Sequence, residues 1–223
     1  MTSIRVPDRL GRLMTVLGAL ALAAALGIIW TARILLDRSV YVSALGAVEE
    51  PSARWFKYAL IMIVFGGLVT AWRARGVRLR RWDAAILRPS ALLGISSFGF
   101  FVASQEPCTS GCPIPVGETI RWQDLVHTSS AVLAFGAAAA AMLAVACSEV
   151  DRSLRLVSLA AASAVAVVAA TGGVFSLLEF RTDLGSLMEF AAASIGVLWL
   201  MWFGIRTPSP GIVNPVPREA ATA

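Results

Sequence analysis

Charged side chains are scarce in this chain of 223 residues, where they make up 15% of the composition against 57% for hydrophobic residues. Soluble domains carry roughly 25% charged residues, so an ordinary soluble fold is excluded. Six apolar runs are long enough, or nearly so, to cross about 30 Å of hydrocarbon. No run alternates with period two, as the strands of a membrane β-barrel do. We therefore predict an all-α membrane protein in which six transmembrane helices form one bundle.

Histidine occurs only once, at His127. Haem held by paired histidines and a metal hydrolase with three histidine ligands are therefore both excluded. A structural zinc site takes about four ligands, and the expected outer face offers two cysteines and this histidine. Covalent haem attachment needs a histidine directly after the second cysteine of a pair, where Pro113 stands. We predict no catalytic residue, no metal and no cofactor.

Cysteine occurs three times, at Cys108, Cys112 and Cys147. The first two lie in residues 104–127, the longest polar stretch in the second half of the chain. On the oxidising face of a membrane we expect this pair to form a disulfide, which closes a short loop and stabilises it by only about 2 kcal/mol in the entropy model. The spacing differs from the Cys-x-x-Cys pair of thiol oxidases. Cys147 is expected to be a free thiol at the inner end of the fourth helix.

The apolar runs also give the boundaries of the expected segments. Residues 1–12 form a cytoplasmic N-terminus, residues 13–205 a transmembrane domain, and residues 206–223 a proline-rich cytoplasmic tail that we expect to be disordered. The six helices are expected at residues 13–32, 55–72, 84–103, 125–148, 156–178 and 184–205. Small residues within several helices let backbones approach closely, so we predict a tight bundle with little internal space.

Basic residues are divided unevenly between the two expected sides of the membrane. With the N-terminus inside, the cytoplasmic segments hold 13 of the 19 basic residues, whereas nine of the 14 acidic residues lie outside. The positive-inside rule then places both termini in the cytoplasm and residues 104–127 outside. All seven tryptophans fall near expected helix ends, where indole anchors a helix at the headgroup level. The arginine-rich composition favours a multi-pass protein of a bacterial cytoplasmic membrane.

Five polar residues are expected near the outer ends of helices four to six: Asp124, His127, Glu179, Arg181 and Glu189. Asp124 lies one turn before His127 and could accept N–H groups at the start of the fourth helix. Glu189 lies about one turn inside the sixth, where an ionisable group needs a partner, and Arg181 or His127 could supply it. We predict that the five residues converge, either as a structural ion-pair cluster or as a ligand site.

Two classes of function fit this pattern. The first is a non-enzymatic membrane protein that binds membrane lipids or a partner membrane protein. The second is a membrane enzyme or small transporter with a polar site at the outer ends of helices four to six. No nucleophile–base pair has suitable spacing and no interrupted helix marks a transport site, so the first class is favoured. Nucleic acid is not an expected partner, despite the net charge of +5, because the arginines border apolar runs.

Several short motifs together resemble one family of integral membrane proteins. They are Ser43-Ala44-Leu45-Gly46, the second-helix entry at 54–65, the segment CTSGCPIP with Asp124 and His127 after it, and Gly172-Gly173 followed by Glu179 and Arg181. The pattern resembles domain of unknown function 998 (DUF998), and the cysteine segment resembles its actinobacterial-type branch. Many members have Asn where Lys57-Tyr58 stands. The resemblance implies six helices and no established reaction. More distantly, the chain is similar to the Frag/DRAM group, some of whose members are linked to lipid organisation.

The arginine bias predicts that residues 75–80 face the cytoplasm. In a background that carries Cys147→Ser, a cysteine introduced as Gly76→Cys should resist a membrane-impermeant maleimide in intact cells and react once the cells are opened. The matched Ser39→Cys variant, on the expected outer side, should react in intact cells. Labelling of position 76 from outside would contradict the predicted orientation.

Overall fold

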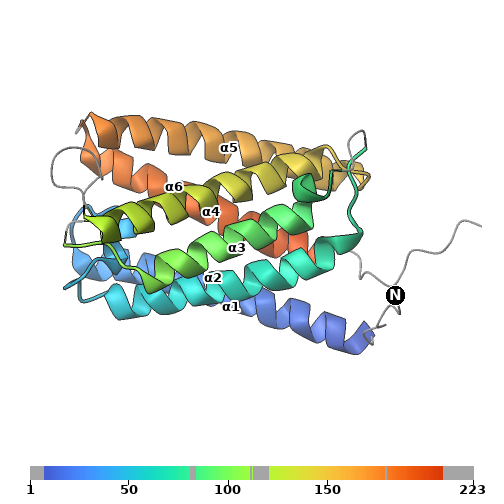
Figure 1. The fold of residues 1–223 in the computed structure, drawn as a ribbon, viewed down its shortest axis with the longest axis horizontal. Coiled ribbons are helices and arrows are strands. Elements are labelled where there is room, and N and C mark those ends of the chain that lie inside the picture. The colour runs from blue at the N-terminus through green and yellow to red at the C-terminus, as the bar shows by residue number, and fades with distance from the viewer. Residues whose placement is uncertain (1–7, 81–83, 111, 113–120, 179, 208–223) are drawn as a thin grey trace, which may run out of the picture.

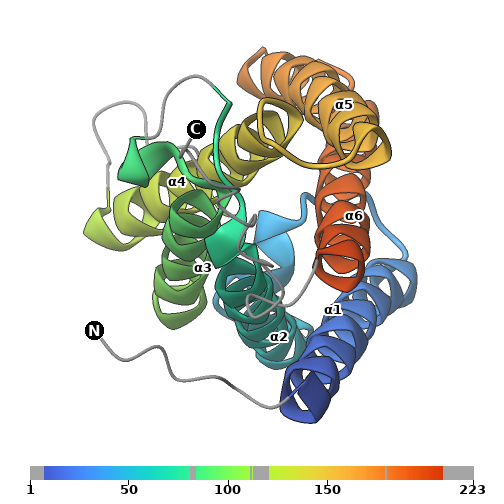
Figure 2. The same cartoon turned by 90° about the vertical axis from the view of Figure 1, so that its right-hand side faces the viewer.

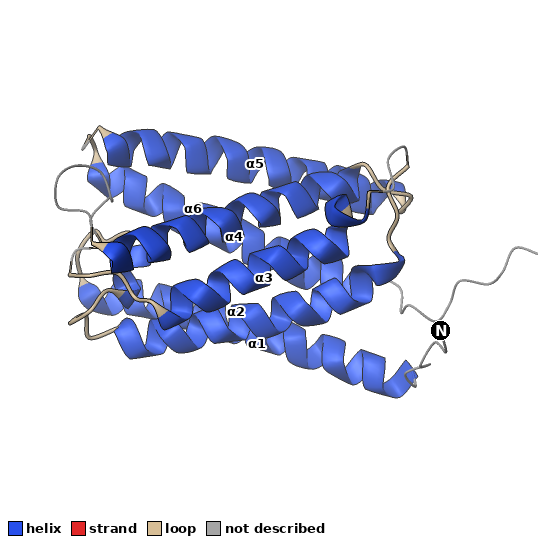
Figure 3. Cartoon of the chain, in the orientation of Figure 1, coloured by secondary structure: helices blue, strands red, loops and turns tan. Residues whose placement is uncertain are grey.

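The computed structural model describes residues 8–80, 84–110, 112, 121–178 and 180–207. Six long helices fill most of these ranges: α1 (Asp8–Leu36), α2 (Ala53–Arg73), α3 (Pro89–Gln105), α4 (Trp122–Ala146), α5 (Arg152–Leu177) and α6 (Thr182–Arg206). Three short 3-10 helices accompany them: η1 (Ser43–Gly46), η2 (Ala74–Gly76) and η3 (Ala85–Leu87). The described ranges contain no strand, as Figure 3 shows. The tail that we expected to be disordered lies, beyond residue 207, outside these ranges.

Five of the described helices are long and apolar enough to cross a membrane, namely α1, α2, α4, α5 and α6. Helix α3 has 17 residues, a length of about 25 Å at 1.5 Å per residue. Large apolar side chains also cover the outside of the bundle, including Leu20 at 61%, Phe98 at 63% and Val167 at 66% exposed. Apolar exposure on this scale fits a surface that contacts lipid. The prediction of an all-α protein with membrane-spanning helices is confirmed.

The long helices follow one another around a ring, and α6 closes the ring against α1 (Figure 2). Helix α2 also contacts α6. Consecutive helices run in opposite directions along the bundle, so the connections gather at its two ends (Figure 1). We call one the cysteine end, which holds residues 37–52, 106–110 and 112, and the other the arginine end, which holds residues 74–80, 84–88 and 147–151.

The connections at the arginine end are joined through their backbones. The Arg80 amide donates to the Cys147 carbonyl at 3.1 Å, and the Glu149 amide donates to the Arg78 carbonyl at 3.0 Å. These two bonds tie the basic α2–α3 connection to the turn between α4 and α5. Cys147 is an exposed free thiol here, as predicted.

The third helix begins at Pro89, five residues later than expected. Proline suits the first helical position, because its fixed φ matches a helix and its missing N–H would be unpaired there. The residue before a proline is disfavoured in the helical conformation, and Arg88 is extended, with φ −64° and ψ 142°. Arg88 therefore precedes the helix, although we predicted it within the first turns.

The prediction of an interfacial anchor is wrong for Trp199. Its side chain is only 4% exposed, and its indole N–H donates to the Ser158 hydroxyl at 2.9 Å. A buried indole needs such an acceptor, so Trp199 belongs to the α5–α6 contact. By contrast, Trp55 and Trp122 are 60% and 76% exposed near the starts of their helices. Trp82 lies outside the described residues.

Close approach of α3 and α4 depends on Gly99. A Cβ atom at this position would lie 2.7 Å from the Ser130 carbonyl oxygen and 2.9 Å from the Ala134 Cβ atom. Both distances are too short for carbon contacts, so the backbones of the two helices touch only because Gly99 has no side chain. Gly94 on the same helix has open space around it.

Substitution of these two glycines should therefore have opposite effects. Gly99→Ala should lower the free energy of unfolding by about 1–3 kcal/mol, the usual cost of overpacking. Gly94→Ala should be neutral or stabilising by up to about 1 kcal/mol, because alanine favours a helix over glycine. Thermal unfolding in one detergent measures both variants. Equal melting temperatures would contradict the tight α3–α4 contact.

Candidate functional site

Two segments that connect long helices close the cysteine end of the bundle. The first, residues 37–52, contains η1, which is buried, and the second, residues 106–110 and 112, follows α3. The Val48 amide donates to the Cys108 carbonyl at 2.9 Å, and the Ser110 hydroxyl donates to the Val48 carbonyl at 3.1 Å. We call these two joined segments the cap.

Cys108 and Cys112 lie at disulfide-bonding distance, with Cα atoms 5.1 Å apart. This is the pairing that the sequence predicted. The Cys108 side chain is completely buried, and its sulfur lies 3.8 Å from the Ser43 carbonyl oxygen at the start of η1. The pair therefore lies between the two cap segments.

Asp124 holds the cap from the first turn of α4. Its carboxylate accepts a hydrogen bond from the Thr109 amide at 2.7 Å and another from the Thr109 hydroxyl at 2.9 Å. The side chain is 2% exposed, so these charge-assisted bonds offset much of the cost of burying the carboxylate. We expected Asp124 to cap its own helix, whereas it binds Thr109, one of the three residues between the two cysteines.

His127 lies one turn further along α4 and binds Glu106, at the start of the cap segment that also contains Thr109. Its Nδ1 atom lies 2.8 Å from the Glu106 carbonyl oxygen. A carbonyl oxygen only accepts, so Nδ1 carries the hydrogen in this contact. The side chain is 3% exposed.

Glu189 on α6 holds the other cap segment. Its Oε2 atom accepts a hydrogen bond from the Val42 amide at 2.8 Å, just before η1, where amides lack a partner within the helix. Glu189 is seven residues into α6 and therefore lies about 10 Å below the start of the helix, deeper than the predicted single turn.

Arg33 on α1 also binds the first cap segment. Its guanidinium donates to the Val40 carbonyl at 3.2 Å and lies 4.5 Å from the centre of the Phe190 ring.

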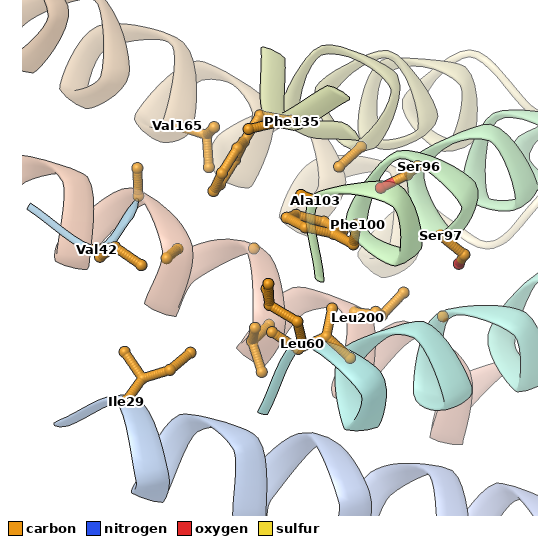
Figure 4. Close-up of a pocket in the computed structure, with 18 of the residues that line it drawn as sticks. Ile29, Val42, Leu60, Ser96, Ser97, Phe100, Ala103, Phe135, Val165 and Leu200 are labelled. Carbon is orange, nitrogen blue, oxygen red and sulfur yellow. The ribbon is translucent and has the colours of Figure 1, made fainter. Parts of the chain in front are cut away.

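A cavity of about 90 Å³ lies inside the ring below the cap. Its walls come from all six long helices and from residues 42–43, and most of them are apolar. Phe100 on α3 and Phe135 on α4 both line it (Figure 4), with ring centroids 5.3 Å apart. His127 and Glu189 line it as well. The prediction of a tight bundle with little internal space did not include this cavity.

The structure brings together some of the five predicted cluster residues. His127 and Glu189 line one cavity, and Asp124 lies a turn from His127. Arg181 instead pairs with Asp183 at 3.3 Å in an exposed contact, because it precedes α6 while Glu189 lies two turns inside that helix. Glu179 lies outside the described residues.

Sequence reasoning missed Arg33 and the burial of η1. We treated residues 33–54 as a polar connection, although Leu45 is completely buried. The small and apolar stretch Ser43-Ala44-Leu45-Gly46 was the available signal, since a solvated loop would carry more polar residues.

The apolar outer surface, the long apolar helices and the internal cavity define a helical membrane protein. Residues 16–206 match the family described as Protein of unknown function (DUF998), and the chain belongs to that family. The resemblance drawn from the short motifs is thereby confirmed. No curated protein and no solved structure matches the chain.

Removal of the Asp124 carboxylate should loosen the cap. Asp124→Ala leaves the amide of the half-buried Thr109 without its charged acceptor, so we expect a loss of about 1.5–3 kcal/mol in the free energy of unfolding. The disulfide should also be reduced faster by an impermeant reductant. Asp183→Ala, which removes an exposed carboxylate, is the matched control and should change neither quantity. An unchanged reduction rate in Asp124→Ala would show that Asp124 does not hold the cap.

Proposed function

We propose that this protein is a non-enzymatic membrane protein that binds a lipid by taking one apolar chain into the ring of helices. The observation that carries the proposal is the cavity of about 90 Å³, with apolar walls and with His127 and Glu189 on its lining. A single water needs only about 10–15 Å³, and an apolar cavity of larger size stays dry and takes apolar guests. A lipid chain is the apolar guest that a membrane supplies.

The position of the ionisable lining residues favours an amphiphile, rather than a pure hydrocarbon, as the ligand of the cavity. Glu189 and His127 both lie about 7–10 Å from the starts of their helices at the cysteine end. Most of the deeper lining residues, such as Leu93 and Leu200, are apolar, and none of the described ones is ionisable, although two serines, Ser96 and Ser97, also line this part. This division matches a ligand that has a polar head near the cap and an apolar tail in the ring.

The second candidate is an enzyme or small transporter that acts at the same polar end. Ser43, His127 and Glu189 line the cavity together, and hydrolases use these residue types. However, His127 bonds the Glu106 carbonyl and Glu189 bonds the Val42 amide, so both side chains hold backbone. This use of the two groups favours binding over catalysis. Reproducible turnover of a lipid ester by the pure protein would reverse the choice.

We further propose six membrane crossings with both termini in the cytoplasm of a bacterial cell. Helix α3 packs beside α2 and α4, and it joins the arginine end to the cysteine end. A helix slightly shorter than the hydrocarbon thickness crosses it at modest cost, by local thinning of the bilayer. The basic connection at the arginine end supports an inside location for that end.

Filling the cavity should displace the lipid. Gly196 lines the cavity, and a Cβ atom there would meet the Met142 Cε atom at 3.9 Å, an ordinary contact. Gly136 lies outside the cavity lining, and a Cβ atom there would have open space around it. Gly196→Leu should reduce the lipid that copurifies in mild detergent by about tenfold, since overpacking costs about 1–3 kcal/mol. Gly136→Leu adds the same side chain to the exposed face and should retain the lipid. Mass spectrometry of extracts measures both, and equal lipid content in the two variants would contradict the proposal.

A further inference from the structure

Three metal-ligating side chains meet beneath the cap. The sulfur atoms of Cys108 and Cys112 and a ring nitrogen of His127 all lie within 4.8 Å of one another. In the sequence, the number of possible ligands argued against a zinc site. The sequence did not reveal that His127 lies beside the two sulfur atoms. The three residues come from two segments, the cap and α4.

We infer that the dithiol form of this cluster binds a soft divalent cation of the zinc type through Cys108, Cys112 and His127, and that the disulfide form does not. The inference is independent of the lipid cavity. It assigns the cysteine pair a second chemical state and gives the only histidine of the chain a ligand role in that state.

The donor set selects the class of metal. Two thiolates and one imidazole suit zinc, cadmium or copper(I), whereas magnesium and calcium prefer oxygen ligands. A separation of three residues between Cys108 and Cys112 falls within the usual spacing of paired cysteine ligands. Three protein ligands leave a fourth tetrahedral position for water, as in zinc sites that keep one open position.

The hydrogen bonds and the burial around these three side chains resemble those around metal sites. The His127 ring donates to the Glu106 carbonyl at 2.8 Å, and metal-bound histidines almost always donate their second N–H in this way. Asp124 fixes the Thr109 amide between the two cysteines at 2.7 Å. Cys108 is 0% and His127 3% exposed, so two of the three donors are shielded from water.

Conversion between the two states balances as thiol–disulfide exchange. A dithiol reductant supplies two electrons and two protons, the sulfur–sulfur bond breaks to give two thiols, and the reductant becomes a disulfide. The cation then displaces the two thiol protons, because thiolates are the metal ligands. Oxidation of the pair removes both thiolates and releases the cation.

Cadmium absorption tests the inference directly. The full chain with Cys147→Ser is purified in mild detergent, reduced with dithiothreitol, freed of reductant without oxygen and titrated with cadmium. We expect an ultraviolet thiolate-to-cadmium charge-transfer band that saturates at one cadmium per chain and is displaced by zinc. The same protein with its disulfide intact should give no band. Absence of the band in the reduced protein, with size-exclusion elution and helical circular dichroism unchanged, would overturn the inference.

A second variant isolates the histidine. Gln at position 127 can still donate to the Glu106 carbonyl, but its amide is a poor metal ligand. His127→Gln should therefore keep the fold and weaken cadmium binding at least about tenfold. Thr128→Gln, at the half-buried neighbour, controls for the longer side chain and should leave the affinity unchanged. Equal cadmium affinity in His127→Gln and the Cys147→Ser parent would remove His127 from the site and overturn the three-ligand assignment.

Discussion

A polar group within an apolar bundle must find its hydrogen-bond partner inside the protein, because water is not available there. The structure meets this requirement at the cysteine end by pairing helix side chains with cap backbone. Glu189 accepts the Val42 amide, and His127 bonds the Glu106 carbonyl. Each bond satisfies a side chain that is costly to bury and a backbone group that no helix satisfies. The cap can therefore pack between the helix ends, and the space beneath it is the cavity.

The two ends of the bundle provide hydrogen-bond partners for their polar groups in different ways. At the arginine end, short connections satisfy one another through backbone bonds such as that from Arg80 to Cys147. Arg75, Arg78 and Arg80 are exposed there. Only the neighbouring Arg73 is buried among these arginines, and it donates to the Thr207 carbonyl. At the cysteine end, the charged side chains of Arg33, Asp124 and Glu189 are directed at backbone groups of the cap. As a result, the ionisable side chains His127 and Glu189 reach the cavity from the cysteine end, which would give the proposed lipid a defined direction.

The sequence predicted the helices because each apolar run carries its own signal of length and composition. It also predicted the cysteine pair, because Cys108 and Cys112 lie in one expected outer loop, whereas Cys147 is expected at the inner end of its helix. It did not predict the late start of α3, although Pro89 was visible, or the burial of Trp199. Nor did the sequence predict the cavity or the backbone amide that Glu189 binds. These features depend on which residues of different helices face each other, and hydropathy along one chain does not contain that information. Arg181 was near Glu189 in sequence, yet Val42 is nearer in space.

Selectivity of the proposed lipid site has to come from its polar end. A chain that leaves water gains about 0.8 kcal/mol for each buried CH₂ group, but a chain that leaves the bilayer exchanges one apolar environment for another and gains almost none of this. Packing against Phe100 and Phe135 would then discriminate by shape, and hydrogen bonds at His127 and Glu189 would discriminate by head group. His127 also belongs to the cluster with the two cysteines. A cation bound there would fix the imidazole and place a positive charge beside the polar end, so on the two proposals together the redox state of the pair would influence the choice of head group.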